Sequence, residues 1–179
     1  MEEKIRLAVF GQKRLSREGG IEIVVKELCT RMAQNGCDVT CYNRAGHHVS
    51  GAEYDKTIEY DGIRQKVVPT IEKKGLAAVS SSFFAALCSA FGRYDVVHIH
   101  AEGPAFFCWI PKLFGKRVIS TIHGECEIIR GCHNRDKGTA ENERLRNPKF
   151  IFSYPKNERR IFLGGSNAIQ KEISTMRVG

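Results

Sequence analysis

The stretch Ile5-Arg6-Leu7-Ala8-Val9-Phe10-Gly11 is followed, after a polar and basic loop, by Gly19-Gly20-Ile21-Glu22 and an amphipathic pattern. The first run predicts a strand that ends at Gly11, and apolar residues at helical spacing over 21–35 predict a helix that Gly36 closes. Two glycines before a helix let backbone amides approach a ligand where unsatisfied N–H groups and the positive end of the helix dipole converge. The arrangement predicts a site for a phosphate or diphosphate.

The rest of the chain continues to alternate strand and helix, which is typical of a parallel sheet with helices on both faces. Further strands are predicted at 38–42, 94–100 and 116–122, and further helices at 76–91 and 105–114. Over 57–68 we expect two short strands joined as a hairpin by Asp61-Gly62. The fold class is α/β, with the strands at 5–10, 96–100 and 118–122 parallel in one sheet.

The composition is that of an ordinary globular domain. The chain has 179 residues, of which 42% are hydrophobic and 27% charged, and one α/β domain is the economical expectation. No apolar run reaches the length of a membrane span, and the N-terminus leads into a strand instead of a signal sequence, so we expect a cytoplasmic location. The seven cysteines are an odd number scattered over the chain, which predicts free thiols.

The formal net charge of +8 is concentrated toward the C-terminus. Residues 1–125 hold 17 Lys and Arg against 14 Asp and Glu, and residues 126–179 hold the remaining 11 against 6. The sequence shows no basic helix and no interleaving of basic and aromatic residues. It therefore does not indicate a nucleic-acid-binding protein. Attraction to anionic lipid or to a phosphate-bearing substrate explains the charge as well as nucleic-acid binding would, and a solvated surface that is simply basic is the commonest explanation.

The carboxyl ends of three predicted strands carry polar or glycine residues, and ligands of open parallel sheets bind at that edge. The three segments are Gly11 to Gly20, His100 to Gly103 and His123 to Glu125. Imidazole titrates near neutral pH, so His100 and His123 are candidates for ligand contact or proton transfer. His98 alternates with His100 on one strand and is interpreted as a core residue. Gly19-Gly20 also has a structural alternative, a permissive turn, and no dinucleotide fingerprint is present.

Four motifs taken together resemble the N-terminal domain of family 4 retaining glycosyltransferases, in particular the bacterial rhamnosyltransferase-like branch that builds surface polysaccharides. The resemblance covers about residues 4–125. It implies one Rossmann-like half of a GT-B fold, in which two such domains face one another across a cleft and the N-terminal domain shapes the acceptor side. The motifs are Gly19 to Glu22, Asn35 to Thr40, Tyr94 to His100 and Thr121 to Gly124.

The resemblance implies transfer of a sugar from a nucleotide-activated donor to a glycan or lipid-linked acceptor. We assign His123 as the catalytic residue near the reacting sugar, and the glycine loop as the part that approaches the donor diphosphate. No cofactor is expected beyond the nucleotide sugar as co-substrate, and no metal, because Cys126, Cys132 and His133 do not have a zinc spacing. The substrate-binding candidates are Gly19, Gly20, His100, Glu102 and Gly124.

We divide the chain into a glycosyltransferase N-terminal domain at 1–125, a divergent basic segment at 126–158 that reads as irregular, and a closing strand and helix at 159–179. In the family a C-terminal domain holds most of the donor, and these 179 residues show no counterpart of it, so we expect little transfer by the chain alone. A donor-binding partner chain and peripheral contact with the membrane are further expectations. The alternative function is a non-catalytic module that binds a phosphate-bearing glycan, lipid or protein. The serines within 76–91 favour a core helix there over a membrane-contacting one.

Overall fold

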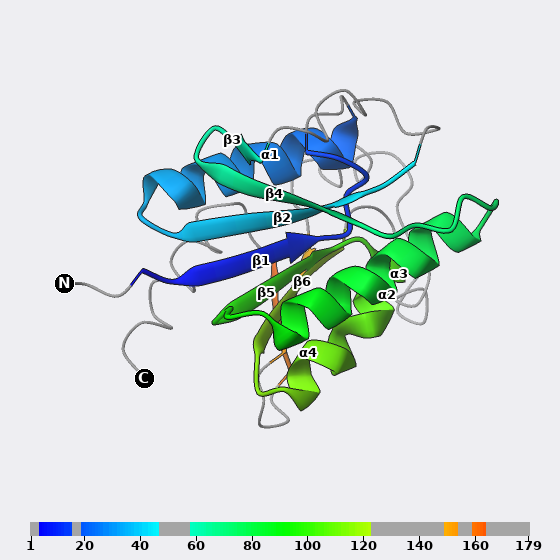
Figure 1. Ribbon diagram of the computed structural model, residues 1–179. Helices are drawn as coiled ribbons and strands as arrows, with labels where there is room; N and C mark the ends of the chain where they lie inside the picture. The colour runs from blue at the N-terminus through cyan, green and yellow to red at the C-terminus, as the bar shows by residue number, and fades with distance from the viewer. Residues whose placement is uncertain (1–3, 16–18, 47–57, 123–148, 154–158, 164–179) are drawn as a thin grey trace, which may run out of the picture.

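Residues 4–15, 19–46, 58–122, 149–153 and 159–163 are described by the computed structural model, and they form one mixed sheet with helices on both faces (Figure 1). Within these residues the sheet has eight strands in the order β3-β4-β2-β1-β5-β6-β7-β8. Their bounds are β1 (Arg6–Phe10), β2 (Asp38–Arg44), β3 (Glu59–Tyr60), β4 (Ile63–Val68), β5 (Val96–His100), β6 (Arg117–Ile122), β7 (Lys149–Ser153) and β8 (Arg159–Leu163).

The centre of the sheet is parallel. Strands β4, β2, β1, β5 and β6 lie side by side in the same direction. Ala8 of β1 lies opposite Thr40 of β2 on one side and Val97 of β5 on the other, and Val97 in turn lies opposite Val118 of β6. The prediction that the strands at 5–10, 96–100 and 118–122 run parallel in one sheet is therefore confirmed.

Helices cover the two faces unequally. Helix α1 (Gly20–Gln34) lies on one face, and α2 (Leu76–Phe91), α3 (Glu102–Ala105), the 3-10 turn η2 (Phe106–Cys108) and α4 (Trp109–Leu113) lie on the other (Figure 1). Successive residues of β1 alternate between the two cores, with Leu7 and Val9 under α1 and Ala8 and Phe10 under α2. Covering both faces explains why Leu7 to Phe10 of β1 form an unbroken apolar run. Among the described residues, no helix combines the length and the apolar character needed to cross a bilayer.

The hairpin is confirmed in a shorter form than predicted. β3 pairs antiparallel with β4, and the turn residues Asp61 and Gly62 both have positive φ, 49° and 75°. Positive φ at both central residues is what a two-residue turn matching the strand twist requires. β3 is only two residues long, and residue 57, where we expected the strand to begin, lies outside the described residues.

The predicted helix at 105–114 is interrupted. α3 begins earlier, at Glu102, a 3-10 turn follows, and regular helix resumes at Trp109. Pro111 lies inside α4 and has no N–H, so it cannot donate the helical hydrogen bond to the preceding turn. The segment therefore packs as short helical pieces instead of one rod.

The sheet continues past β6 in the antiparallel sense. Ser120 of β6 lies opposite Ile151 of β7, and Ile151 lies opposite Ile161 of β8. β7 falls within 126–158 and was not predicted, because that segment reads as polar and irregular. β8 coincides with the expected closing strand, while the helix expected after it lies outside the described residues. The division at 125 and 158 stays a prediction.

Candidate functional site

The carboxyl edge of the sheet is tightest where β1 meets β5. Gly11, the first residue after β1, has φ +115°, and a Cβ on it would lie 1.9 Å from the carbonyl oxygen of His100, the last residue of β5. Real Cβ atoms do not approach other atoms within 3.0 Å. Only glycine allows the two strand ends to meet this closely.

The end of β5 is also held in an unusual conformation. Ala101 has φ 74°, which is uncommon for a residue with a side chain. Its N–H donates to the carbonyl of Thr121 in β6 at 2.9 Å, and its carbonyl accepts from the N–H of Ala105 in α3 at 3.2 Å. The neighbouring strands thus fix the strained residue at the edge where the ligand is expected, and such strain is commonly found at functional sites.

The start of α1 leaves space for a ligand. Gly19, the N-cap, has φ 179°, an extended conformation open to any residue. A Cβ on Gly20 would have no atom within 4 Å. Neither the backbone nor the packing of the described residues therefore explains a glycine at position 20, while close approach of a ligand to the amides of the first turn would explain it.

The loop between β1 and α1 buries two polar residues, Gln12 and Arg14, within its described part, residues 11–15, while Lys13 is exposed. Arg14 is only 1% exposed, and its guanidinium donates to the carbonyl of Gly46 at 3.0 Å. The N–H of Leu15 donates to Oδ1 of Asn43 at 3.1 Å, and Lys13 N–H donates to Oε1 of Glu22 at 3.2 Å. The basic charge of this loop is therefore partly structural, because buried Arg14 and its neighbours join the loop after β1 to β2 and α1 by hydrogen bonds.

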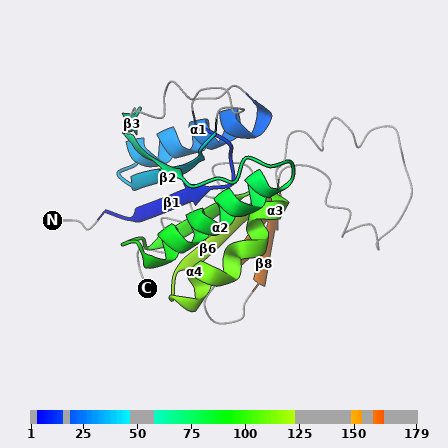
Figure 2. The same cartoon turned by 45° about the vertical axis from the view of Figure 1, so that its right-hand side comes forward.

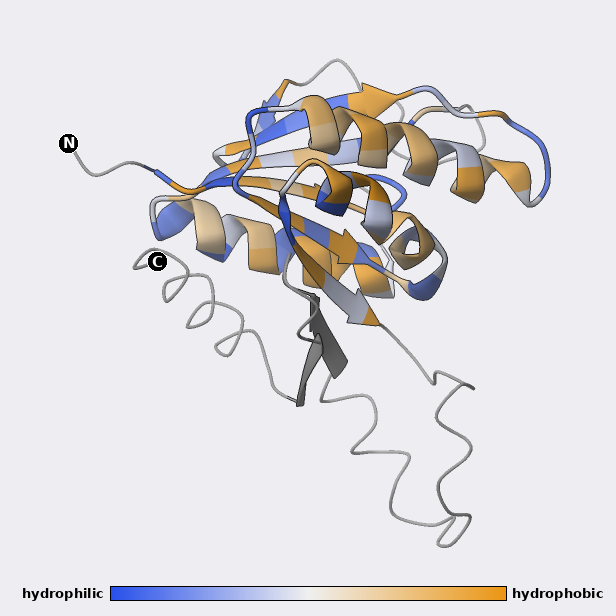
Figure 3. Cartoon of the chain, turned by 90° about the horizontal axis from the view of Figure 1, so that it is seen from below, coloured by the Kyte–Doolittle hydropathy of each residue, from blue (hydrophilic) through white to orange (hydrophobic). Residues whose placement is uncertain are grey.

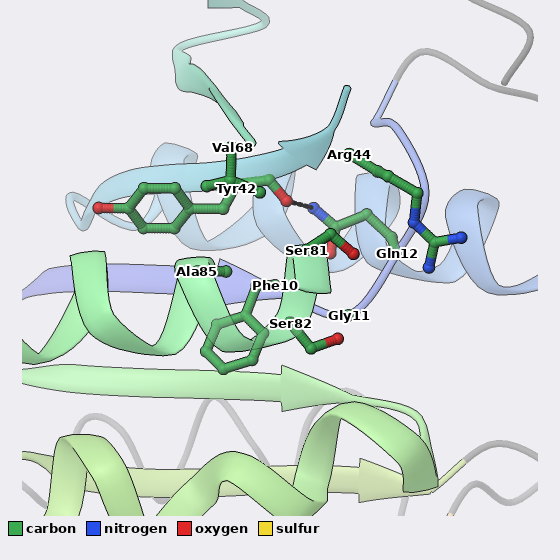
Figure 4. A pocket seen from close by; sticks show the side chains of 9 residues that line it. All are labelled: Phe10, Gly11, Gln12, Tyr42, Arg44, Val68, Ser81, Ser82 and Ala85. Carbon is green, nitrogen blue, oxygen red and sulfur yellow. Dashed lines mark hydrogen bonds between the residues drawn. The ribbon is translucent and has the colours of Figure 1, made fainter. Parts of the chain in front are cut away.

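A small hollow lies beneath this edge, between the sheet and α2 (Figure 4). Gln12 is 3% exposed, and its Nε2 donates to the carbonyl of Tyr42 at 3.2 Å, while its Oε1 has no hydrogen-bond partner among the described residues. The enclosed space is about that of one water molecule, too small for a sugar ring. The residues that line it are Phe10, Gly11, Gln12, Tyr42, Arg44, Val68, Ser81, Ser82 and Ala85.

Of the residues of the hollow, only Gly11 and Gln12 lie within a segment that the sequence indicated as a ligand site, Gly11 to Gly20. Ser81 and Ser82 donate their hydroxyl hydrogens to the α2 carbonyls of Ala77 and Ala78, at 2.7 and 2.6 Å, so toward the hollow they can only accept hydrogen bonds. Burial, helped by a 3.0 Å hydrogen bond between the hydroxyls of Tyr42 and Tyr94, raises the pKa of Tyr42 far above its usual range and keeps it neutral. For the other residues, the run of serines in an otherwise apolar segment was the only signal in the sequence.

The two histidines of β5 lie on one face and are fully buried. Their ring centroids are 4.1 Å apart, and Nε2 of His98 lies 2.7 Å from Oγ1 of Thr121. The interpretation of His98 as a core residue is confirmed. His100 is 0% exposed, so its side chain is not accessible at the carboxyl edge in this structure. Its assignment to substrate binding stays a prediction.

The remaining candidates are only partly described. Glu102 is exposed at the first position of α3, and Gly103 beside it has open space around its Cβ position. His123 and Gly124 lie outside the described residues. Of the candidates, Gly19, Gly20, His100 and Glu102 can be placed. His100 ends β5 and Glu102 begins the helix after it, while Gly19 and Gly20 lie at the start of the helix that follows β1, and β1 and β5 are neighbouring strands.

A central parallel sheet, helices on both faces and a glycine-bearing helix start at the carboxyl edge define a Rossmann-like α/β domain. The sequence profile of the family described as Glycosyltransferase Family 4 matches residues 18–173. The chain belongs to this family. The match includes the segment 126–158 and reaches the expected closing helix. Among the curated proteins, no match to the chain was found.

Proposed function

We propose that the chain is the N-terminal, acceptor-side half of a bacterial glycosyltransferase that acts in the cytoplasm, at the inner face of the membrane, in polysaccharide biosynthesis. It would transfer a hexosyl group such as rhamnosyl from a nucleotide-activated donor to a glycan or lipid-linked acceptor, with no further cofactor. The observation that carries the proposal is the family match over residues 18–173. Glycosyl transfer requires a sugar donor and an acceptor, and both would meet at the carboxyl edge of the sheet.

The start of α1 supports a role in holding the donor diphosphate. The first N–H groups of a helix have no partner within it, and the dipole adds partial positive charge there. The open space around Gly20 would let phosphate oxygens reach these amides. As the leaving diphosphate gains negative charge in the transition state, donors fixed in advance stabilise it more than they stabilise the ground state.

We propose a separate role in sugar transfer for each candidate residue. Gly19 and Gly20 would contact the diphosphate, His123 would act beside the reacting sugar, and Glu102 and Gly124 would line the acceptor side. His100 would position the strand end, since its ring is buried. The helix start alone offers only part of the charge stabilisation. We therefore propose that transfer needs a second, donor-binding domain, whether carried on the same polypeptide or on another chain.

Titration of a panel of nucleoside diphosphate sugars by calorimetry tests the proposal. The 179-residue chain is measured alone and with a donor-binding domain of the same family, and product formation is followed in parallel. We expect binding and transfer in the combined sample and little or no transfer by the chain alone. Robust turnover by the chain alone would overturn the need for a second domain. Binding without transfer in the combined sample would favour the non-catalytic module.

A pair of variants then assigns the contact to the helix start. Gly20→Leu fills the open space, and we expect it to weaken nucleotide-sugar binding at least about tenfold, because a blocked diphosphate loses charge-assisted hydrogen bonds worth about 1.5–3 kcal/mol each. Gln34→Leu is the matched control, since Gln34 is an exposed residue at the other end of the same helix. Equal binding by both variants would remove Gly20 from the site.

A further inference from the structure

Helix α2 buries all four of its serines and exposes four of its large apolar residues. Its buried residues include Ser80, Ser81, Ser82 and Ser89, whereas Leu76, Val79, Phe83 and Phe91 are exposed large hydrophobics. The buried hydroxyls donate to carbonyls of their own helix, as Ser80 does to Leu76 at 2.8 Å and Ser89 to Ala86 at 2.8 Å. An ordinary surface helix shows the opposite arrangement. In the sequence, these serines favoured a core helix over a membrane-contacting one. In the structure they lie on the buried side of α2.

The apolar surface extends over the neighbouring helical segments. Phe106 is 73% exposed, Leu113 is 74% exposed and Trp109 is half exposed, and these residues are spaced by three and four along η2 and α4. α2 and α4 lie side by side on the same side of the sheet in both views (Figures 1 and 2). Of the thirteen exposed large hydrophobics among the described residues, eight lie here: Leu76, Val79, Phe83, Phe91, Phe106, Trp109, Leu113 and Phe114.

Aromatic contacts join the helices into one surface. The ring centroids of Phe83 in α2 and Phe107 in η2 are 5.9 Å apart, and those of Phe91 at the end of α2 and Phe114 after α4 are 4.6 Å apart. In Figure 3, α2 is mostly orange, the colour of hydrophobic residues, and the loop that precedes it is blue, the colour of hydrophilic residues. We call this surface the α2–α4 face. A continuous apolar surface of this kind normally contacts an apolar partner.

The charges around the α2–α4 face are mainly positive. α2 itself contains no charged residue, and residues 72–117 carry six Lys and Arg against three Asp and Glu. One of the three acids, Asp95, is paired with Arg6 outside this segment at 2.8 Å. Exposed Lys73 and Lys74 come just before α2 and exposed Arg93 just after it. Positive charge at both ends of an aromatic surface complements anionic lipid headgroups above an acyl layer.

We propose that the α2–α4 face docks peripherally on an anionic lipid surface, an inference that rests on the proposed action at the inner face of the membrane and assigns the surface that makes the contact. Phe106, Trp109 and Leu113 would enter the boundary between headgroups and acyl chains, and the lysines before α2 would pair with headgroup phosphates. A folded protein partner would need hydrogen-bonding groups on the face, but the exposed side chains of α2 are aliphatic, aromatic or thiol. α2 begins at the end of the sheet where β1 and β4 finish, so docking would also bring the carboxyl edge toward the membrane.

Vesicle flotation of the full 179-residue chain tests the proposal, with phosphatidylcholine vesicles compared with vesicles that also contain phosphatidylglycerol. We expect binding to the anionic vesicles that weakens as salt is added. The double variant Phe106→Ser with Leu113→Ser should bind at least about tenfold more weakly, because burying each of these side chains is worth about 1.5–3 kcal/mol. The matched control is Ile23→Ser with Ile58→Ser, which removes two hydrophobics that are 60% and 74% exposed outside the α2–α4 face.

A charge variant separates the two contributions. Lys73→Glu with Lys74→Glu should reduce binding to anionic vesicles at least about tenfold and leave the weak binding to neutral vesicles unchanged, since each lysine near such a surface contributes about 1 kcal/mol. Circular dichroism checks that each variant is folded. The proposal is overturned if the wild type does not float with anionic vesicles, or if the control pair loses as much binding as the test pair. It is also overturned if sedimentation shows self-association that the Phe106 and Leu113 changes abolish, because the face would then bind a second copy.

Discussion

Replacing Gly11 by alanine tests the packing that closes the carboxyl edge of the sheet. The new Cβ would lie 1.9 Å from the carbonyl oxygen of His100 and 2.8 Å from its carbonyl carbon. Both neighbours are backbone atoms of a central strand, so no flexible side chain can move aside. To reach even 3.0 Å, the two strand ends would have to separate by about 1.1 Å, next to the pair formed by Phe10 and Ile99.

Two costs add at this position. Alanine at φ +115° carries a conformational penalty of about 1–3 kcal/mol. Overpacking in a region that cannot relax costs about a further 1–3 kcal/mol. We therefore expect Gly11→Ala to lower the free energy of unfolding by about 2–6 kcal/mol, a large part of the roughly 5–15 kcal/mol typical of a whole domain.

Urea unfolding followed by far-UV circular dichroism measures this loss as a lower midpoint. Gly36→Ala is the control, because Gly36 also has positive φ, +85°, but a Cβ there has no atom within 4 Å. It should show only the conformational penalty, about 1–2 kcal/mol for a left-handed residue. If Gly11→Ala costs no more than Gly36→Ala, the close contact with His100 does not constrain the edge and the reasoning fails.

Two further predictions concern a carboxylate and a pair of thiols. Hydrogen bonds from Arg6 hold the pKa of Asp95 below its usual range, so their contribution to stability is present above the ordinary carboxyl pKa and is lost as pH falls through the lowered value. Asp95→Asn should therefore cost about 1 kcal/mol or less near neutral pH, since the pair is partly exposed, and urea midpoints of variant and wild type should converge in acid; a constant gap would contradict this. Cys29 and Cys41 are buried with their sulfurs 3.6 Å apart, and the hydrogen bond between them, together with burial, raises the pKa of Cys41. A thiol reagent should label exposed Cys88 in the native protein but reach both buried thiols only in denaturant; native labelling of Cys41 at the rate of Cys88 would show that this core opens.

The strands and helices up to residue 122 were predictable because their signals are local. The run Val96 to His100 is apolar enough for a strand buried on both faces, and Asp61-Gly62 specifies a tight turn by its own backbone preference. β7 was missed although Phe150-Ile151-Phe152 is a local strand signal, because the residues around it within 126–158 read as polar. The 3-10 turn before α4 was predictable in principle, since Pro111 lacks the N–H that a continuous helix needs.

The candidate site was predictable only as a location. Alternation of strand and helix places the residues that follow β1, β5 and β6 at one edge, and the sequence alone determined this. The tertiary structure decided which side chains face that edge. Arg14 is buried and donates to the carbonyl of Gly46, and the ring of His100 is buried. Gln12 lines the small hollow together with Ser81 and Ser82 of α2.

The sequence by itself determined the α/β fold, the parallel direction of its central strands and the glycine-bearing start of α1. These features were predictable because periodicity and turn preference act between residues close along the chain. Only the tertiary structure decided the orientation of α2. A helix with serines on one side and aromatic residues on the other can be buried either way, and the choice depends on the space that β1 and β2 leave. Here that space accepts small serines whose hydroxyls bond to their own helix, and the large rings stay outside. Burial is a property of neighbours brought from distant parts of the chain, and no local pattern encodes it.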